Sequence, residues 1–507
     1  MSSNNEPVDF RFDAIVCGSG AAGCVIAVEL AKSGMSVILL EASDINDGSL
    51  EHISDQINVH GRPSTLYNYA RQLGGSTNLW SGRTSFFEPI DFSLNDWPLS
   101  YEELEADITA ARSIINAAEP TLDEHIRLAF SGFWSALAKP PFSLKRFVMQ
   151  HRISPFNAYS YLKGQQLSNL KVLQNVVVRR VLHDGGDVAI GLEVYDGVTD
   201  TLKSMSSGLF VLATGGLDVP RLLLESNLPA HTSCAPIGQY LSTHPKLHVG
   251  TLKLSGRRRA NNALLSDMFL GSQYVRLGLG LDAEVLEREQ ILNHYLQISP
   301  AFEAKTQDFL DVLSQRSKFV SYLYGRGGKS RSVVQFFGRL YFLLSQRIAG
   351  KLGYYSTFKL KLHCDQYPSR NHRVSLSERS TDSKTKRINI DWTFTNRDYN
   401  DARSFLLKVK YYVENAGLGT VDLEDFVYDS EWPMIGIHSH HMGTTRMGKD
   451  QKTSVTDEFG KLHGFKNIYI AGPSLFTGYG YTNPVLPIVV LAIRTARRIV
   501  LGQNHKP

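Results

Sequence analysis

Cysteine is scarce in this sequence and never occurs in a metal-binding or haem-binding spacing. The four cysteines among 507 residues are Cys17, Cys24, Cys234 and Cys364, and none forms a CxxC or CxxCH motif. Zinc, iron–sulfur and attached haem sites need such clustered ligands, so we expect no metal site. Cys17 and Cys24 fall inside a predicted strand and helix, where a small buried thiol is the simplest interpretation.

Long apolar runs are also missing. No stretch reaches the roughly 18 uncharged apolar residues that span a bilayer, and the C-terminal VLPIVVLAI is short enough to begin a buried helix. The start, MSSNNEPVDFRF, lacks a basic region followed by an apolar core, so it does not resemble a secretory signal. We therefore expect a cytoplasmic protein.

Neither sign of charge dominates the chain. Lys and Arg number 54 against 49 Asp and Glu, which leaves a net charge of +5 and a pI near 8.8. A surplus this small, without any nucleic-acid module, indicates no nucleic-acid partner. With 42% hydrophobic and 20% charged residues, the composition is typical of a packed globular protein, and 507 residues predict two large lobes.

Acidic residues are absent from residues 318–364, which contain nine basic ones. Such a block is not typical of a solvated surface of mixed charge. Its part at 333–348 could form a helix, either as a lid over an active site, as an amphipathic helix on anionic lipid, or as a buried helix. The lipid alternative would place the protein peripherally at the inner face of a membrane, with a quinone as electron acceptor.

Three glycines near the N-terminus predict a dinucleotide site. FDAIVC indicates a buried parallel strand, AAGCVIAVELAKSG a helix and MSVILLEAS a second strand. Between the first strand and the helix, Gly18 permits a tight turn, Gly20 lets the backbone approach a pyrophosphate, and Gly23 lets the helix pack closely. Glu41 ends the second strand, where a carboxylate accepts ribose hydroxyls. This argues against NADP but does not separate NAD from FAD.

Several later stretches resemble the glucose-methanol-choline (GMC) family of flavin oxidoreductases, almost from end to end of the chain. Those that carry the resemblance are RQLGGSTNLWSGR (71–83), LFVLATGGLDVPRLLLES (209–226), IGQYLSTHP (237–245), CDQYPSRNHRVSLS (364–377), HSHHMGTTRMG (438–448) and NIYIAGPSLFTGYGYTNPVLPIVVLAIRTARRI (467–499). A nicotinamide enzyme has no reason to carry the C-terminal pattern, so the resemblance implies FAD.

The resemblance implies an α/β protein of two domains. A Rossmann-like FAD-binding domain is expected from residues 8–90, 150–245 and 436–507. A discontinuous substrate domain, built on an antiparallel sheet with helices, is expected from 91–149 and 246–435.

The same resemblance implies which positions contact FAD. They are Gly18, Ser19, Gly20, Ala21, Ala22, Gly23, Glu41, Gly74, Gly75, Ser76, Asn78, Leu79, Trp80, Ser81, Val177, Ala213, Gly472, Asn483 and Pro484. GGSTNLWSG is similar to the sugar-oxidising, pyranose oxidase-like branch, in which a histidine before the tryptophan is attached to the flavin. Leu79 takes that position, so FAD is expected to be non-covalent. Ser81 falls where the branch has a hydroxyl near flavin N5, although a turn serine is the alternative.

The C-terminal segment also has physical features that suit a flavin. Gly478 and Gly480 would leave the backbone bare where a flat ring could pack. Pro484 would hold Asn483 extended and then begin a helix, whose positive end would stabilise negative charge on a reduced flavin. This segment would supply a ring contact, a polar side chain and a dipole.

Oxidation of an alcohol needs a base near neutral pKa, and histidine fits best. In an extended segment His438 and His440 would share one face and His441 the other. Periodicity cannot choose among them, but the resemblance implies His440, six positions before Arg446; a packing or metal-binding histidine is the alternative. It also implies Asn483 as the residue that holds the alcohol oxygen, unless it only caps a turn, and Gln366 as a substrate contact.

We therefore predict an FAD-dependent oxidoreductase that converts an alcohol of a sugar, glycoside or polyol into a carbonyl by hydride transfer to flavin N5. Oxygen, a quinone or a redox partner would reoxidise it. Three rivals remain: a redox-silent lyase of the same fold, similar to hydroxynitrile lyases, an NAD-linked dehydrogenase, and a non-enzymatic scaffold that retains flavin.

Overall fold

The computed structural model of the chain describes most of the sequence. It covers residues 12–42, 54–59, 62–63, 70–117, 136–149, 155–229, 232, 235–255, 260–261, 268–270, 273–301, 354–381, 383–433 and 440–504. His438 and residues 318–353, with the predicted helix at 333–348, lie outside these ranges, so the alternatives for that helix stay predictions.

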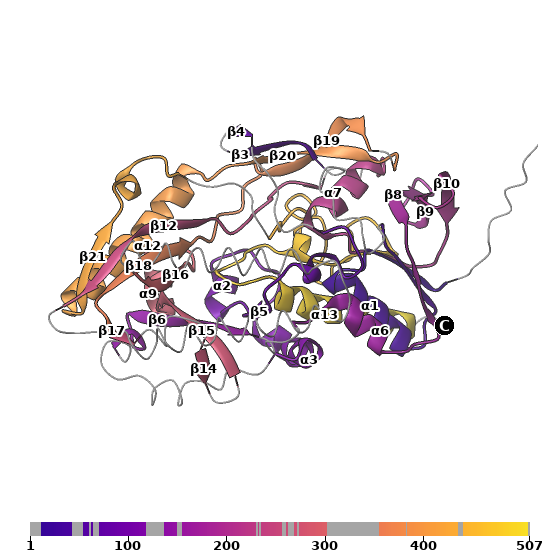
Figure 1. Cartoon of the computed structure of the whole chain (residues 1–507). Helices are drawn as coiled ribbons and strands as arrows, with labels where there is room; N and C mark the ends of the chain where they lie inside the picture. Colours follow the sequence, from indigo (N-terminus) through magenta and orange to yellow (C-terminus); the bar gives the residue numbers. More distant parts are fainter. Residues whose placement is uncertain are drawn as a thin grey trace, which may run out of the picture.

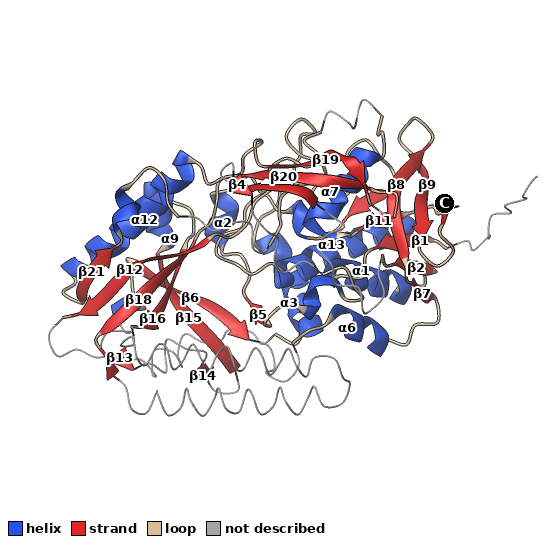
Figure 2. Ribbon diagram, turned by 45° about the horizontal axis from the view of Figure 1, so that its top comes forward, coloured by secondary structure: helices blue, strands red, loops and turns tan. Residues whose placement is uncertain are grey.

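A five-stranded parallel sheet forms the right-hand part of the molecule in Figure 2. Its order is β22-β11-β1-β2-β7, and every neighbouring pair is parallel. The strands are β1 (Ala14–Cys17), β2 (Val37–Leu40), β7 (Leu170–Leu173), β11 (Phe210–Leu212) and β22 (Ile468–Ile470). The central strands are buried along their whole length, as the apolar runs predict for a sheet covered on both faces.

Helices from distant parts of the chain cover this sheet. The first and last helices lie side by side, indigo and yellow in Figure 1, although more than 450 residues separate their starts. The helices are α1 (Ala21–Lys32), α3 (Glu105–Ile115), α6 (Ala158–Gly164), α7 (Gly215–Glu225) and α13 (Val485–Asn504). A three-stranded antiparallel sheet stands beside them, made of β8 (Val176–His183), β9 (Ala189–Asp196) and β10 (Thr201–Met205).

An eight-stranded antiparallel sheet forms the left-hand part in Figure 2. Its order is β21-β12-β18-β16-β15-β6-β5, with β14 paired to β15. The strands are β5 (Arg83–Thr84), β6 (Phe142–Met149), β12 (Lys246–Leu254), β14 (Met268–Leu270), β15 (Gln273–Leu281), β16 (Tyr295–Pro300), β18 (Thr357–His363) and β21 (Gly419–Leu423). Apolar side chains of one face join α9 (Ala283–Glu289) and α12 (Asn396–Asn415) in a second core.

Smaller pieces connect the two parts. A four-stranded sheet contains β3 (Ser54–Val59), β4 (Arg62–Pro63), β19 (Arg373–Ser380) and β20 (Lys386–Trp392). Three further short elements are β13 (Ala260–Asn261), β17 (Tyr354–Tyr355) and α2 (Pro89–Ser93).

The predicted fold class, a Rossmann-like domain with an antiparallel substrate sheet, is confirmed. Some segments pack differently from the expected division, however; strand β5, within 8–90, belongs to the antiparallel sheet. Helix α3 lies within 91–149 but contributes Ile108 and Ala111 to the core of the parallel sheet. Strand β3 lies within 8–90 but pairs with β20. The chain therefore crosses between the two parts more often than the motifs indicate.

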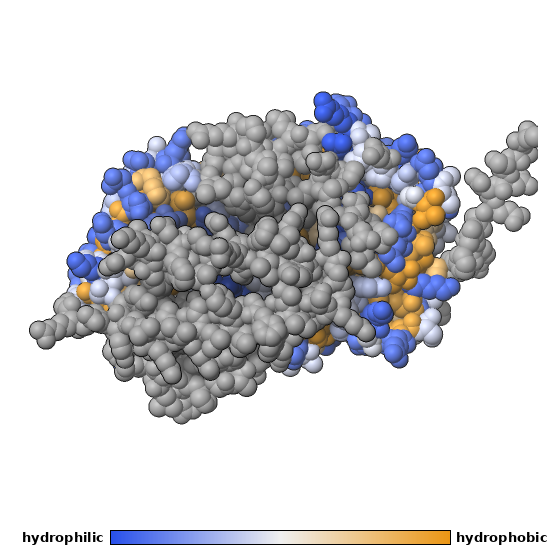
Figure 3. All heavy atoms as spheres, in the orientation of Figure 1, coloured by the Kyte–Doolittle hydropathy of each residue, from blue (hydrophilic) through white to orange (hydrophobic). Residues whose placement is uncertain are grey.

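The surface mixes polar and apolar side chains. Figure 3 shows hydrophilic residues over most of the coloured surface and hydrophobic ones gathered most densely at its right-hand end. Large exposed apolar side chains include Leu173, Ile190 and Leu202, on β7, β9 and β10. Among the described residues, no helix is long and apolar enough to cross a membrane.

The close packing of α1 on β1 generates a first prediction. A Cβ atom at Gly23 would lie 1.8 Å from the carbonyl oxygen of Gly18, so even alanine forces the helix away from the sheet. We expect Gly23→Ala to lower the free energy of unfolding by about 1–3 kcal/mol or more, measured by urea unfolding. Gly164→Ala in α6 is the control, because a Cβ there meets nothing within 4 Å. Equal stability of the two variants would contradict this packing argument.

Candidate active site

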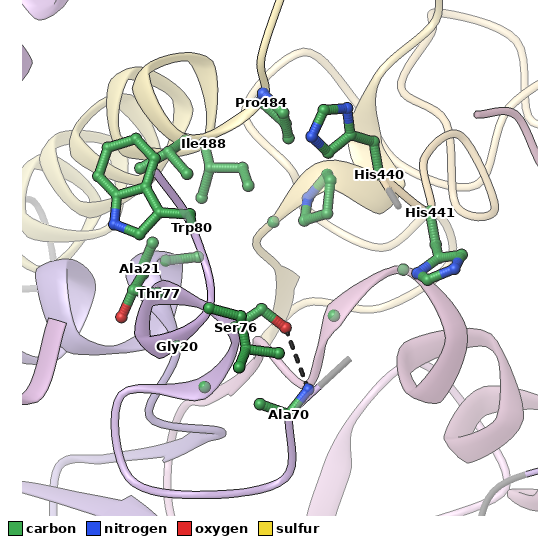
Figure 4. A pocket seen from close by; sticks show the side chains of 18 of the residues that line it. Gly20, Ala21, Ala70, Ser76, Thr77, Trp80, His440, His441, Pro484 and Ile488 are labelled. Atoms are coloured by element: carbon green, nitrogen blue, oxygen red, sulfur yellow. Dashed lines mark hydrogen bonds between the residues drawn. The ribbon is translucent and has the colours of Figure 1, made fainter. Parts of the chain in front are cut away.

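A cavity of ≈ 670 Å³ lies between the two parts and is lined by residues from both sheets. Most of the sequence-predicted positions line it. These are Gly18, Ser19, Gly20, Ala21, Ala22, Glu41, Gly75, Ser76, Leu79, Trp80, Ser81, Val177, Ala213, His440, Gly472, Asn483 and Pro484. Figure 4 shows several of them, with Gly20, Ala21 and Trp80 on one side of the view and His440 and Pro484 on the other.

The glycine turn opens into this cavity at the start of α1. Gly18 has φ +94°, and a Cβ there would come within 2.7 Å of the Ala213 carbonyl oxygen. A Cβ at Gly20 would meet nothing within 4 Å, so this residue faces open space. Helix α1 has no side-chain cap and no acidic residue in its first turn. Its N–H groups and positive helix end are therefore available to an anion such as a pyrophosphate.

Glu41 lies at the end of β2 and is held by Ser19. The backbone N–H and the hydroxyl of Ser19 donate to one Glu41 carboxylate oxygen at 2.9 and 2.5 Å. The other oxygen accepts from the Ala42 N–H at 2.8 Å. Glu41 is 6% exposed and lines the cavity. These bonds fix the carboxylate at the position where an adenosine ribose would be recognised.

The loop at 74–81 packs directly on the glycine turn. A Cβ at Gly75 would lie 3.1 Å from the Cα of Gly20, so a larger residue would push the loop away. Gly74 and Asn78 support this loop from behind and do not line the cavity; the Asn78 side chain donates to the Leu73 carbonyl at 2.8 Å. The Trp80 indole N–H donates to the Phe156 carbonyl at 2.8 Å.

Gly478 and Gly480 do not provide the bare surface for a ring that the sequence suggested. A Cβ at Gly478 would collide with the Asn95 side chain at 2.1 Å, and one at Gly480 with the Asp91 carboxylate at 2.6 Å. Neither glycine lines the cavity. They are small because two buried side chains pack against them, which a sequence pattern cannot reveal.

Pro484 does precede helix α13, as predicted, and the start of this helix reaches the cavity through Val485 and Ile488. The Asn483 amide nitrogen donates to the Arg83 carbonyl oxygen at 3.1 Å. One amide proton thus anchors the side chain, and the second proton and the amide oxygen remain for other partners.

Gln366 lies apart from the cavity lining. It is fully buried; its side-chain oxygen accepts from the Trp392 indole at 2.8 Å and from Ser242 at 3.2 Å. Its nitrogen donates to the Thr393 carbonyl at 2.9 Å. These bonds hold Gln366 inside the wall behind the site.

His440 and His441 both line the cavity, although an extended segment would place them on opposite faces. The reason is the positive φ of His440, 67°, which breaks the alternation. Such a conformation is uncommon for a residue with a side chain and costs about 1–3 kcal/mol. Strain of this kind clusters at functional sites, where the surrounding packing maintains it.

A further histidine, His244, touches His440. The sequence did not identify it as a site residue. The two Nδ1 atoms lie 3.1 Å apart, and the ring planes are nearly perpendicular at 89°. The only signal in the sequence was its place in the family-like stretch 237–245. Its partner is 196 residues away along the chain, so this contact exists only in the folded protein.

The site keeps these imidazoles neutral. Burial lowers the pKa of His244 to about 3, with a further contribution from the positive charge of Lys246. Burial also holds the pKa of His440 well below its usual range, helped by His244, Lys246 and His441. The pKa of His441 falls to about 4 because the ring is buried. At neutral pH all three are uncharged, so each ring keeps one unprotonated nitrogen.

The antiparallel sheet adds a group of basic residues that the motifs did not indicate. They line the cavity from β5, β12, β15 and β18: Arg83, Lys246, Arg276 and Lys361. Tyr295, Gln297 and His363 lie on the same wall. Of these residues, Lys361 belongs to the basic block at 318–364.

This geometry fits FAD, with an uncapped helix end and a fixed carboxylate at one end of the cavity and neutral histidines at the other. Fold and site together define a flavin-dependent oxidoreductase.

A family profile described as "FAD dependent oxidoreductase" matches residues 13–277, more than half of the chain. One described as "GMC oxidoreductase" matches residues 368–492. The chain belongs to the family of FAD-dependent oxidoreductases, and its C-terminal part matches the GMC oxidoreductase model, as the resemblance predicted. The predicted enzyme class and cofactor are confirmed.

Individual relatives are distant. The fructose dehydrogenase large subunit of Gluconobacter japonicus is 20% identical over 96% of this chain and 97% of its own length. The 6'''-hydroxyparomomycin C oxidase of Streptomyces lividus is 30% identical over 26% of this chain; the match spans 23% of that relative's length. The crystal structure of pyridoxine 4-oxidase from Mesorbium loti is 16% identical, with a TM-score of 0.59 over 98% of this chain and 100% of that one. It supports the fold alone.

The neutral histidines predict acid sensitivity. Unfolded histidine has a pKa near 6.5, whereas His244 and His441 have folded-state pKa values of about 3 and about 4. Below pH 6.5 the unfolded chain therefore binds protons that the folded chain does not, and stability falls as pH falls. Each ring contributes about 2 kcal/mol of this loss between pH 7 and pH 5.

We expect His441→Gln to lose about 2 kcal/mol less than the parent over that interval, measured by urea unfolding at both pH values. His248→Gln is the control, because His248 is 42% exposed on β12. A parent-like loss in His441→Gln would refute the buried neutral state of this ring.

Proposed function

We propose that this protein oxidises an alcohol group of a sugar, glycoside or polyol-like substrate to a carbonyl. The observation that carries the proposal is the convergence of a neutral His440 and an anchored Asn483 on the cavity that the glycine turn opens into. The sugar-oxidising names among the relatives support the substrate class.

Bound FAD supplies the acceptor for the hydride that leaves the carbon carrying the hydroxyl group. Gly18, Gly20 and the start of α1 would hold its pyrophosphate, and Glu41 its ribose. The loop containing Trp80 and the start of α13 would enclose its ring system. Leu79 cannot form the histidyl attachment of the sugar branch, so the cofactor is held by these contacts alone.

His440 is the general base in this proposal. It accepts the hydroxyl proton as the C–H bond breaks, which requires an unprotonated ring nitrogen facing the substrate. Asn483 holds the alcohol oxygen through its second amide proton. Because the Arg83 carbonyl fixes the amide, the oxygen is held in one orientation.

The role of His440 as the base requires one of the two proton arrangements that its contact with His244 allows. When Nδ1 of His440 carries the proton and donates to His244, Nε2 of His440 is free to act as the base. The opposite arrangement would place a proton on Nε2 and block the reaction. In this proposal His244 is a positioning residue that selects the reactive tautomer.

The first test is anaerobic mixing with sugars, glycosides and simple alcohols, read by loss of the visible flavin band. His440→Ala should slow flavin reduction about a hundredfold or more, because a general base contributes this much. Asn483→Ala should be milder, at about tenfold. His248→Ala, outside the cavity, is the control. An unchanged rate in His440→Ala would disprove the role of the base, and bleaching by none of the alcohols would favour the lyase.

A second test addresses His244. His244→Asn retains an acceptor for the His440 N–H, whereas His244→Phe removes it. We expect the phenylalanine variant to lower kcat for flavin reduction with little change in KM and to alter its pH profile, and the asparagine variant to restore part of the rate. Equal rates in the two variants would show that His244 only fills space.

Reoxidation of the reduced protein by oxygen, by a quinone or by a protein redox partner would identify the electron acceptor. Peripheral contact with a membrane through 318–364 is proposed only together with a quinone acceptor. Vesicle co-sedimentation at low and high salt tests that contact.

A further inference from the structure

The cavity wall formed by the antiparallel sheet is positively charged. Lys246, Arg276 and Lys361 line it from three different strands, β12, β15 and β18, and Arg83 joins them from β5. The registers place Lys246 opposite His363 and Gln297 opposite Lys361. The basic residues therefore share one wall with the polar residues of the site.

Side-chain alternation explains why this wall is polar. In β18 Leu360 and Leu362 enter the apolar core, so Lys361 and His363 point to the other face. In β16 Leu296 and Ile298 enter the same core, and Tyr295 and Gln297 line the cavity. A sheet of this kind has one face for the core and one for the ligand.

Aromatic rings pack closely on this wall. A Cβ at Gly278 would lie 1.7 Å from the Tyr295 ring, so this glycine lets the ring approach the backbone of β15. The Tyr295 ring contacts Phe147 at 5.1 Å and His363 at 4.8 Å between centroids. These rings keep the sheet residues in fixed positions beside the basic group.

Among the described residues, no carboxylate pairs with the two lysines of this wall. Among the described residues that line the cavity, the acidic ones are Glu41 and Asp218. Glu41 is held by Ser19 at the nucleotide end, and Asp218 is paired with Arg221 at 2.5 Å. In the described part of the chain, neither Lys246 nor Lys361 forms an ion pair with a carboxylate.

The clustering of positive charges changes the pKa of Lys246. Burial, together with the positive charges of Lys361, Arg83 and Arg276, lowers the pKa of this ammonium group to about 8. Lys246 in turn depresses the pKa of His440 and of His363. The basic group therefore lies within electrostatic reach of the proposed base.

We infer that the substrate carries an anionic group, a carboxylate or a phosphate, which binds to Lys246, Arg276 and Lys361 while its hydroxyl group lies between His440 and Asn483. This rests on the proposed alcohol oxidation and names its substrate class more narrowly. The pyrophosphate of FAD is not the expected partner of these residues, because the helix α1 end that suits it lies on the parallel sheet. Three cations from three strands can surround an anion, and arginine adds a planar fork that matches either group.

The test uses the flavin-loaded protein and small anions, so that it does not depend on knowing the substrate. Inorganic phosphate and acetate are titrated at constant ionic strength, and binding is measured from the visible flavin spectrum and from the melting temperature. We expect saturable shifts in the parent protein. Lys246→Gln and Lys361→Gln should each weaken the binding of at least one anion by about tenfold or more.

Lys359→Gln is the matched control. It removes the same charge from the same strand, two residues from Lys361, but Lys359 does not line the cavity. It should bind the anions like the parent. Of the two cavity variants, Lys361→Gln is the one less prone to misfold, because Lys361 is exposed whereas Lys246 is partly buried. Absence of a saturable shift in the parent, or parent-like binding in both cavity variants, would overturn the inference.

A second set of measurements separates this inference from the proposed function and distinguishes the two anions. D-Gluconate, D-glucose 6-phosphate, D-glucose and D-glucosamine are compared for binding and for anaerobic flavin bleaching. Tighter binding of gluconate or of glucose 6-phosphate than of glucose supports the inference. Gluconate would indicate a carboxylate and glucose 6-phosphate a phosphate. Tightest binding of glucosamine, which is cationic, contradicts the inference. Anion binding without bleaching by any alcohol would reject the oxidation but not the anion site.

Discussion

The contact between helix α1 and strand β1 is the constraint on which the cofactor end of the site depends. Gly23 lies so close to Gly18 that no Cβ fits between them, and Gly18 in turn lies against the Ala213 backbone. This packing places the uncapped start of α1 at the cavity, with Gly20 facing open space. The loop at Gly75 then rests on Gly20, so one close approach positions three separate segments of the wall.

The histidine end of the cavity depends on desolvation. His440 and His441 are neutral because they are buried and because Lys246 opposes a further positive charge near His440. A neutral base is useful for alcohol oxidation, yet the same burial makes the fold less stable in acid. The strained backbone of His440 fits this pattern, since rigid surroundings are needed to hold both the conformation and the unprotonated ring.

The antiparallel sheet links these two properties to substrate choice. Its apolar face forms part of the second core, and its polar face lines the cavity. The charges on that face affect both the base and any ligand beside it. In our proposal the same lysine keeps His440 deprotonated and attracts an anionic substrate, so selectivity and catalysis share an electrostatic source.

The strand–turn–helix unit, the place of Glu41 at the end of β2, the family resemblance and the cofactor could be predicted from the sequence, because these depend on residues close together in the chain or on family motifs. The sequence also indicated His440, Asn483 and the helix after Pro484. Contacts between distant segments bring His244 to His440 and pack Asn95 and Asp91 against Gly478 and Gly480. They also hold Gln366 inside the wall of the site. The tertiary structure also brought basic residues from four strands onto one cavity wall. Those contacts join residues tens to hundreds of positions apart, and no local pattern encodes which distant side chains the packed sheets bring together.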